Sequence, residues 1–188
     1  MESIKLKTPL SDNVIAGLRT GDWATISGIV YTARDAAHRR MSEEVEKGLP
    51  LPFDPRGQVV YYVGPTPAPP GRVIGSAGPT TAGRMDPFTN LLIERGLKGM
   101  IGKGGRSKTV REGIQKHGSI YFGAVEGTAA LLSEHIVKAE VVAYEDLGTE
   151  SIRRLEVNDF PVLVVNDIFG GDLYEEGKKR YRRRLNSE

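Results

Sequence analysis

Three cationic side chains lie in turns made of small residues, and their chemistry suits the binding of an anion. Arg34 lies in the stretch TARDAAH, Arg84 in GPTTAGRMD and Lys103 in GKGG. An arginine can hold a carboxylate through two parallel N–H bonds, while a lysine adds a compact positive charge. Three cations in one pocket would repel one another unless an anion with about two charges lay between them. The sequence therefore predicts a dicarboxylate site.

The small residues around the cations belong to the same hypothesis. Gly102, Gly104 and Gly105 surround Lys103, and glycine lets backbone N–H groups approach a ligand closely. Threonines in the second turn add hydroxyl groups without bulk. Each turn is expected at a junction between a strand and a helix. Active-site loops gather at the carboxyl ends of strands in α/β sheets, so we expect these turns to face one pocket.

Each cation also has a simpler interpretation. Arg34 could cap a surface helix or pair with Asp35, and Arg84 could pair with Asp86. Lys103 could simply be solvated. Each of these alternatives is reasonable alone, whereas the joint occurrence of three cations in three such turns favours a binding site.

The glycine-rich stretch GMIGKGGRSKT (99–109) has two other interpretations. A phosphate-binding P-loop requires Lys and Ser/Thr after its last glycine, but Gly105 and Arg106 stand there. The GKGG loop before a helix is similar to the GXXG loop that grips a nucleic-acid backbone in KH domains. Lys108 occupies a position where a KH domain has an apolar residue. A KH-like RNA-binding module remains the alternative from a different functional class.

The elements that position these turns follow from the apolar pattern. The stretches WATISGIVYTA (23–33) and QVVYYV (58–63) are rich in β-branched and aromatic residues and predict strands. The proline-rich stretch 64–71 cannot join a central ladder. Pro87 suits the first turn of a helix. Further strands are expected at 5–10, from residue 72, and at 98–101, 119–124, 136–148 and 151–167, with helices after Ser11, at 34–47, 107–117 and 128–135.

This interleaving of strands and short helices predicts a single domain of the α/β or mixed α+β class. Hydrophobic residues make up 39% of the 188 residues, which is enough for a folded core. The sequence contains no run of about 18 apolar residues that could span a membrane. The N-terminal MESIKLKTPL lacks the apolar stretch of a secretory signal. We therefore expect a cytoplasmic protein that does not enter the membrane.

Metal binding by this chain is not expected. There are no cysteines, which excludes disulfides and thiolate metal sites within the chain. His38, His117 and His135 are spaced too widely for a zinc motif.

The charge is distributed unevenly along the chain. The net charge is +2, but KKRYRRR (178–184) carries six cations, which leaves −4 for the rest. We divide the chain into a domain at 1–177 and a basic C-terminal tail at 178–188. The tail is expected to be the solvated end of an amphipathic helix, because one short basic segment is weak support for nucleic-acid binding.

At the three turns the sequence resembles a known family. TARDAAHRR, SAGPTTAGRMD and GKGG are similar to segments of the iron–sulfur-dependent hydro-lyases, in the β subunit or C-terminal region of class I fumarate hydratase and L(+)-tartrate dehydratase. The resemblance extends from TPLSDNVIAGLRTGD to VNDFPVLVVND, which is nearly the whole chain. It implies a swivelling β/β/α domain like the mobile domain of aconitase-type enzymes.

The resemblance also implies a reaction, a cofactor and a partner. The reaction is the reversible hydration of fumarate to L-malate. A 4Fe-4S cluster would act as Lewis acid, held by the cysteines of an α subunit in an α2β2 assembly, and this chain would be inactive alone. Ala82 and Gly83 favour fumarate over tartrate, because tartrate dehydratases carry bulkier residues there.

Carried over residue by residue, the resemblance assigns roles to the side chains. Arg34, Arg84 and Lys103 would bind the substrate carboxylates. Thr80 would take the proton from the carbon beside a carboxylate, and Thr81 next to it would contact the substrate or take that role instead. A neutral hydroxyl is a very weak base, so an aspartate of the α subunit would have to activate it.

The turn after the second strand carries two further candidates. Asp35 and His38 match the RDxxH pattern of the family. His38 would be an acid/base or an orienting group, since histidine transfers protons readily near neutral pH. A structural role in packing or capping is an equally good interpretation of His38.

Overall fold

Five parallel strands form the part of the sheet that leads to the candidate turns. The computed structural model describes residues 3–124 and 128–185, without the side chains of 183–185. Parallel pairing joins the five strands side by side in chain order. They are β1 (Ile4–Lys7), β2 (Trp23–Thr32), β3 (Val59–Tyr61), β4 (Gly99–Gly102) and β5 (Ile120–Gly123).

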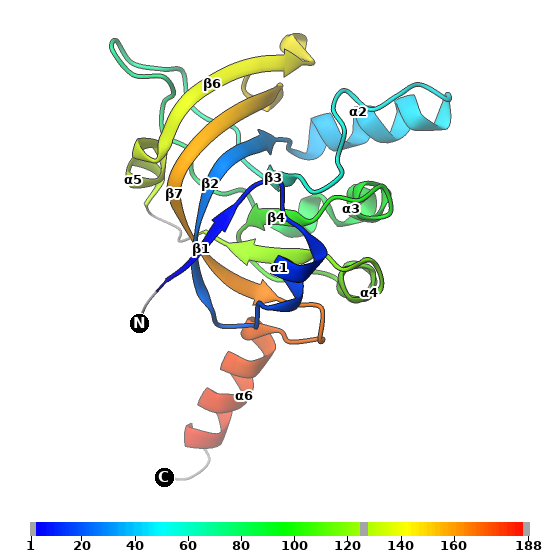
Figure 1. Ribbon diagram of the computed structural model, residues 1–188, viewed down its shortest axis with the longest axis vertical. Helices are drawn as coiled ribbons and strands as arrows, with labels where there is room; N and C mark the ends of the chain where they lie inside the picture. Colours follow the sequence, from blue (N-terminus) through cyan, green and yellow to red (C-terminus); the bar gives the residue numbers. More distant parts are fainter. Residues whose placement is uncertain (1–2, 125–127, 186–188) are drawn as a thin grey trace.

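One long antiparallel strand closes this sheet on itself. β7 (Ile152–Asn166) pairs with β5, with β2 and with the edge strand β6 (Ile136–Ala143). Figure 1 shows β6, β7 and β2 curving together around one side of the molecule. Because β7 bonds to both β2 and β5, the strands enclose an apolar interior.

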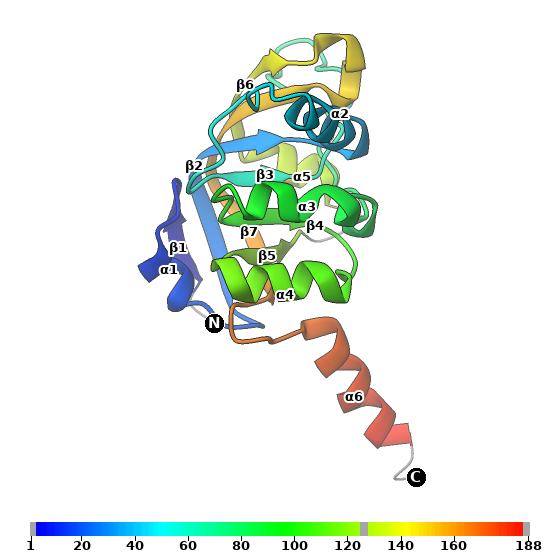
Figure 2. The ribbon, with the colours of Figure 1, turned by 90° about the vertical axis from the view of Figure 1, so that its right-hand side faces the viewer.

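Side chains point alternately to the two faces of each strand, and this separates the enclosed interior from a second apolar layer. Val59 and Tyr61 belong to the enclosed cluster, whereas Val60 and Tyr62 belong to a cluster on the helical side. Three helices cover this outer face of the sheet (Figure 2). They are α2 (Asp35–Glu46), α3 (Asp86–Ile93) and α4 (Lys108–His117). The expected mixed α/β class is confirmed, and the layers are consistent with a swivel-like β/β/α domain.

Local sequence signals fix where the helices begin and end. Ser11 accepts a hydrogen bond from the N–H of Val14 at the start of α1 (Asp12–Ala16), and Ser107 accepts one from Val110 at the start of α4. Gly118 ends α4 in the left-handed conformation, with φ of 65°. Pro87 lies in the first turn of α3, as predicted.

The strand expected from residue 72 is absent, so that prediction was wrong. Residues 72–76 instead fold onto the proline-rich loop, where Ser76 donates to Thr66 Oγ1 at 2.9 Å and accepts from its N–H at 3.1 Å. A methyl group added to Gly75 would lie 2.4 Å from the Thr66 carbonyl. This close contact with a neighbouring loop replaces the ladder that an apolar Val-Ile pair would otherwise favour.

The remaining elements are short, apart from the last helix. They are α5 (Ala129–Glu134), the 3-10 helices η1 (Ala82–Arg84) and η2 (Glu145–Glu150), and α6 (Leu173–Leu185). Helix α6 extends away from the body in both views (Figures 1 and 2) and runs across the proposed boundary at residue 177. No helix within the described ranges combines the length and apolar character needed to cross a membrane.

Candidate active site

The candidate turns meet at the carboxyl ends of β2, β3 and β4. Arg34 comes two residues after β2, and Lys103 comes directly after β4. The segment from Pro79 to Arg84 follows no strand of its own, but it is bonded to both neighbours. The Thr80 N–H donates to the Tyr62 carbonyl at 2.6 Å, and the Lys103 N–H donates to the Thr80 carbonyl at 3.1 Å. The second turn is thereby held between the ends of β3 and β4.

A further backbone bond locks the second and third turns together. The Ala82 N–H donates to the Lys103 carbonyl at 2.8 Å, so Thr81 and Lys103 lie side by side as in a parallel ladder. Gly102 makes this approach possible, because a methyl group there would lie 2.9 Å from the Tyr62 ring and 3.3 Å from the Thr80 carbonyl. Gly104 has φ of 80°, which favours glycine.

Arg34 lies against the end of β3. A methyl group on Gly64 would be 2.8 Å from Nη1 of Arg34, so the guanidinium crosses over this glycine. Gly64 is two residues beyond Tyr62, whose carbonyl holds Thr80, and two residues span at most about 7 Å. The first and second turns are therefore neighbours at one edge of the sheet.

Carboxylates accompany Arg34 in this position. Nη2 of Arg34 lies 3.1 Å from Glu150 Oε1 and 3.6 Å from Asp35 Oδ1. Glu150 also accepts the Ala36 N–H, in the first turn of α2. The side chain of Arg34 is 22% exposed, so one part of it is available at the surface. The predicted pairing of Arg34 with Asp35 is present, but Glu150 is the closer partner.

Arg84 differs from Arg34 in having no such carboxylate. It is exposed on η1, and among the described residues no acidic group lies within salt-bridge distance of it. Asp86, the partner considered from the sequence, instead accepts from Nε of Arg106 at 2.7 Å. The alternative interpretation of Arg84, that it pairs with Asp86, is therefore wrong.

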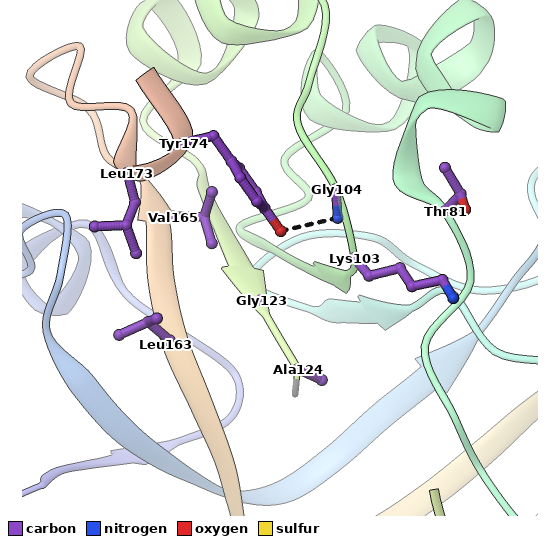
Figure 3. A pocket seen from close by; sticks show the side chains of 9 residues that line it. All are labelled: Thr81, Lys103, Gly104, Gly123, Ala124, Leu163, Val165, Leu173 and Tyr174. Atoms are coloured by element: carbon purple, nitrogen blue, oxygen red, sulfur yellow. Dashed lines mark hydrogen bonds between the residues drawn. The ribbon is translucent and has the colours of Figure 1, made fainter. Parts of the chain in front are cut away.

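Lys103 and Thr81 line a pocket of about 600 Å³. Figure 3 shows these two side chains on one side of the pocket and an apolar group on the other. Tyr174 belongs to the apolar side, and its Oη accepts the Gly104 N–H at 3.0 Å. Thr80 is not among the lining residues, whereas Thr81 is exposed there. The apolar group consists of Leu163, Val165, Leu173 and Tyr174.

His38 is enclosed behind the turn that carries Arg34. It is 1% exposed, and its Nδ1–H donates to the Arg34 carbonyl at 2.9 Å. A carbonyl can only accept, so the proton is on Nδ1 and Nε2 is left as an acceptor. The pKa of His38 is lowered from 6.5 to about 4, chiefly by burial; the hydrogen bond to Arg34 opposes this shift, and the charge of Arg106 contributes to it. The imidazole is therefore neutral near pH 7.

Two side chains in this region were not foreseen from the sequence. Arg106 is completely buried, and Glu150 approaches Arg34 from a distant part of the chain. Burial alone would lower the pKa of Arg106, but the neighbouring Tyr62 and Asp86 raise it above its usual value, so the guanidinium stays charged. One indication of this role was present in the sequence: Arg106 directly follows GKGG, and no function was assigned to it there.

The donor groups of this chain do not fit a metal or an iron–sulfur cluster. The sequence has no cysteine. Among the residues that the structure describes, no group of three or more histidine, aspartate and glutamate side chains could hold a metal ion. We therefore assign no cluster ligand to the side chains that the structure describes.

Comparison with known proteins gives a consistent set of relatives. The family described as Fumarase C-terminus matches residues 1–177. The chain is 44% identical over 154 residues to "Fumarate hydratase 1, mitochondrial" of Leishmania major, and 40% identical over 154 residues to "Fumarate hydratase class I, anaerobic" of Escherichia coli. Each match covers 81% of this chain but 28% of the relative, so the chain corresponds to a fraction of those enzymes.

A third relative has a similar length. "Putative L(+)-tartrate dehydratase subunit beta" of Methanocaldococcus jannaschii is 33% identical over 183 residues, which is 94% of each chain. The family match covers more than nine-tenths of this sequence and includes all three turns. The chain thus belongs to the Fumarase C-terminus family.

Proposed function

We propose that this chain is the β subunit of a hydro-lyase that catalyses the reversible hydration of fumarate to L-malate. The observation that carries the proposal is the pair of backbone bonds that joins Thr80 and Ala82 to Lys103. These bonds hold the turn that carries the threonine pair and an exposed arginine beside the lysine, which supports one shared site. Arg34 lies at the end of the neighbouring strand, so three cations at one edge of the sheet would contact the two carboxylates of the substrate.

The side chains of this chain would bind the substrate and move one proton. Hydration adds a hydroxyl to one carbon of the double bond and a proton to the other. In the reverse direction, Thr80 accepts the proton from the carbon beside a carboxylate, the hydroxyl leaves the adjacent carbon, and the electron pair of the C–H bond forms the double bond. Because a threonine hydroxyl is a very weak base, an aspartate of the partner must take up its proton. Thr81 lines the pocket and is the alternative for this role.

The turn after β2 would serve to orient Arg34. His38 holds the carbonyl of Arg34, and Asp35 lies beside the guanidinium. A neutral, enclosed imidazole is better suited to positioning than to exchanging protons with a substrate. We therefore favour an orienting role for His38 and Asp35 over direct acid/base catalysis.

The proposal requires a second subunit. A 4Fe-4S cluster would be ligated by cysteines of an α partner, since this chain has none. One relative, matched over 94% of its length, is named as a subunit beta, and this name supports such a division. An α2β2 assembly, closure of this domain over the substrate and a cytoplasmic location remain predictions.

The test is reconstitution with an iron-loaded α subunit under anaerobic conditions, followed by fumarate absorbance. Arg84→Ala should lose about 2–4 kcal/mol of transition-state stabilisation, because one charge-assisted carboxylate contact disappears. Arg95→Ala is the matched control, since Arg95 is also exposed and its side chain bonds, within the described part of the chain, only to the Leu91 carbonyl. Equal turnover in both variants would remove Arg84 from the site.

Tartrate or a related 2-hydroxy diacid is the second candidate substrate. The tartrate dehydratase relative matches over 94% of both chains, whereas the match to the first fumarate hydratase covers 28% of that longer protein. The same reconstituted complex should therefore be assayed with both diacids. If the complex acts on neither diacid and the chain binds RNA in a salt-sensitive way, the proposal is contradicted in favour of an RNA-binding module.

A further inference from the structure

Arg106 has an unusual environment for an arginine. Its side chain is 0% exposed, and all three guanidinium nitrogens have partners. Nε donates to Asp86 Oδ1 and Nη2 donates to Thr89 Oγ1, both at 2.7 Å. Nη1 donates to Tyr62 Oη at 3.2 Å. A buried charge requires complete pairing of this kind, so its position is narrowly defined.

The first connection runs to the turn that carries Arg84. Asp86 directly follows this turn and accepts from Arg106 through one carboxylate oxygen. Its other oxygen accepts the Ser107 N–H at 2.6 Å. Thr89, the other partner on α3, donates to the Met85 carbonyl at 2.8 Å. The end of the second turn is thereby tied to the end of the glycine loop.

The second connection runs to the glycine loop itself. The guanidinium carbon of Arg106 lies 4.9 Å from the centre of the Tyr121 ring, a cation–π contact. Tyr121 Oη donates to the Gly104 carbonyl at 2.9 Å. Arg106 and Tyr121 therefore fix both sides of the loop that presents Lys103.

The third connection runs through Tyr62 to the turn after β2. The Tyr62 ring meets the ring of His38 edge to face, with 5.5 Å between the centroids. His38 in turn holds the Arg34 carbonyl. The same tyrosine accepts from Arg106 through its hydroxyl and from Thr80 through its backbone carbonyl.

We propose that Arg106 is a positioning residue that sets the relative placement of the three turns carrying Arg34, Thr80 to Arg84, and Lys103. The inference rests on the proposed function and adds a residue that does not touch substrate. A role limited to general stability is the alternative. The hydrogen bonds of Arg106 lead to elements that bear the candidate site residues, which is the distribution that a positioning role requires.

The first experiment measures kinetics of the reconstituted complex. Arg106→Lys keeps the charge but cannot bond to Asp86, Thr89 and Tyr62 together, so kcat/KM should fall at least about tenfold with a rise in KM. Thr89→Val removes one partner without changing size and should show a smaller change of the same kind. Arg56→Lys is the control, because Arg56 also donates Nε and Nη2 to one aspartate but lies before β3, at the opposite edge.

The KM separates positioning from stability. A purely structural loss lowers the active fraction, and hence kcat, but leaves the KM of the remaining enzyme unchanged. An unchanged KM in Arg106→Lys would therefore overturn the inference. If that variant does not fold, the KM of Thr89→Val decides in the same way.

The second experiment does not depend on activity. Amide hydrogen exchange in the isolated chain should become at least about tenfold faster at residues 80–86 and 102–105 in Arg106→Lys and Thr89→Val, but not in Arg56→Lys. Exchange at the wild-type rate in these segments would overturn the inference. An inactive wild-type complex contradicts only the proposed function, and exchange then decides the positioning role.

Discussion

Arg84 precedes Asp86 by two residues in the sequence and Arg106 is bonded to it, yet the environments of the two arginines are opposite. Arg106 is enclosed and donates to an aspartate, a threonine and a tyrosine, while Arg84 is exposed without a carboxylate partner among the described residues. Asp86 cannot neutralise both, and it is the buried guanidinium that holds it. The difference shows how one cation is kept available for a ligand while another organises the surrounding loops.

The largest expected effect is on stability. Replacing Arg106 with alanine leaves Asp86, whose side chain is 12% exposed, without a cationic partner, and should lower the free energy of unfolding by about 3–5 kcal/mol. Arg84→Ala should change it by less than about 0.5 kcal/mol, since the side chain is exposed. Urea unfolding of the isolated chain measures both. Similar losses in the two variants would abolish the distinction between them.

A second test uses pH to probe the buried side of this comparison. The folded pKa of His38 is about 4, below its ordinary 6.5, so the unfolded chain binds more protons between these values. The contribution of neutral His38 to the free energy of unfolding is therefore complete above about pH 6.5 and is lost as the pH falls toward 4. Between pH 7.5 and pH 5 the wild-type free energy of unfolding should fall by about 2 kcal/mol from this group alone.

The matched variants identify the histidine responsible. His38→Asn can still donate to the Arg34 carbonyl, and it should lose this part of the pH dependence. His117→Asn, changed at the end of α4, should keep the wild-type slope. If the pH dependence of the free energy of unfolding persists in His38→Asn, other groups cause it. His38 would then not be the enclosed neutral imidazole described above.

The positions of the turns were predictable because they depend on local chemistry. Small residues around Arg34 and Lys103 predicted turns after strands, and the parallel sheet brings both to one edge. The turn with Thr80 was expected after a strand that is absent, and it reaches the same edge through its backbone bonds to Tyr62 and Lys103. The helix predicted at 107–117 is present as α4, with Ser107 and Gly118 as its caps for equally local reasons. The fold class followed from the same alternation of strands and helices.

The choice of ionic partners was not predictable in this way. Asp86 stands two residues from Arg84 in sequence but pairs with Arg106, because burial rather than proximity along the chain determines which pairing is favourable. Glu150 reaches Arg34 only after β7 has folded back onto β2. Such contacts depend on the closed sheet, which no local pattern encodes.

Glycines extend the comparison between the packed and exposed sides. A methyl group on Gly102 would press on the Tyr62 ring at 2.9 Å, so Gly102→Ala should destabilise the fold by about 1–3 kcal/mol through overpacking. Nothing lies within 4 Å of the corresponding position on Gly83, beside Arg84. Gly83→Ala should leave stability within about 0.5 kcal/mol of wild type. Thermal unfolding of the two variants measures the contrast, and an equal loss in both would contradict it.

Arg34 lies between the two extremes, and the smallest effect is expected there. It is partly exposed and already paired with Glu150. Glu150→Gln removes the negative charge at nearly constant size, so stability should fall by no more than about 1 kcal/mol, as for other partly exposed pairs.

Freed from the carboxylate of Glu150, Arg34 should attract a substrate carboxylate more strongly, and the KM for fumarate should fall by up to about fivefold. Asp146→Asn is the control, since Asp146 also lies in η2 but pairs with Arg40. A higher KM in Glu150→Gln would show instead that Glu150 holds Arg34 in its binding position. Arg34 would then resemble Arg106, whose partners fix it in place, rather than the exposed Arg84.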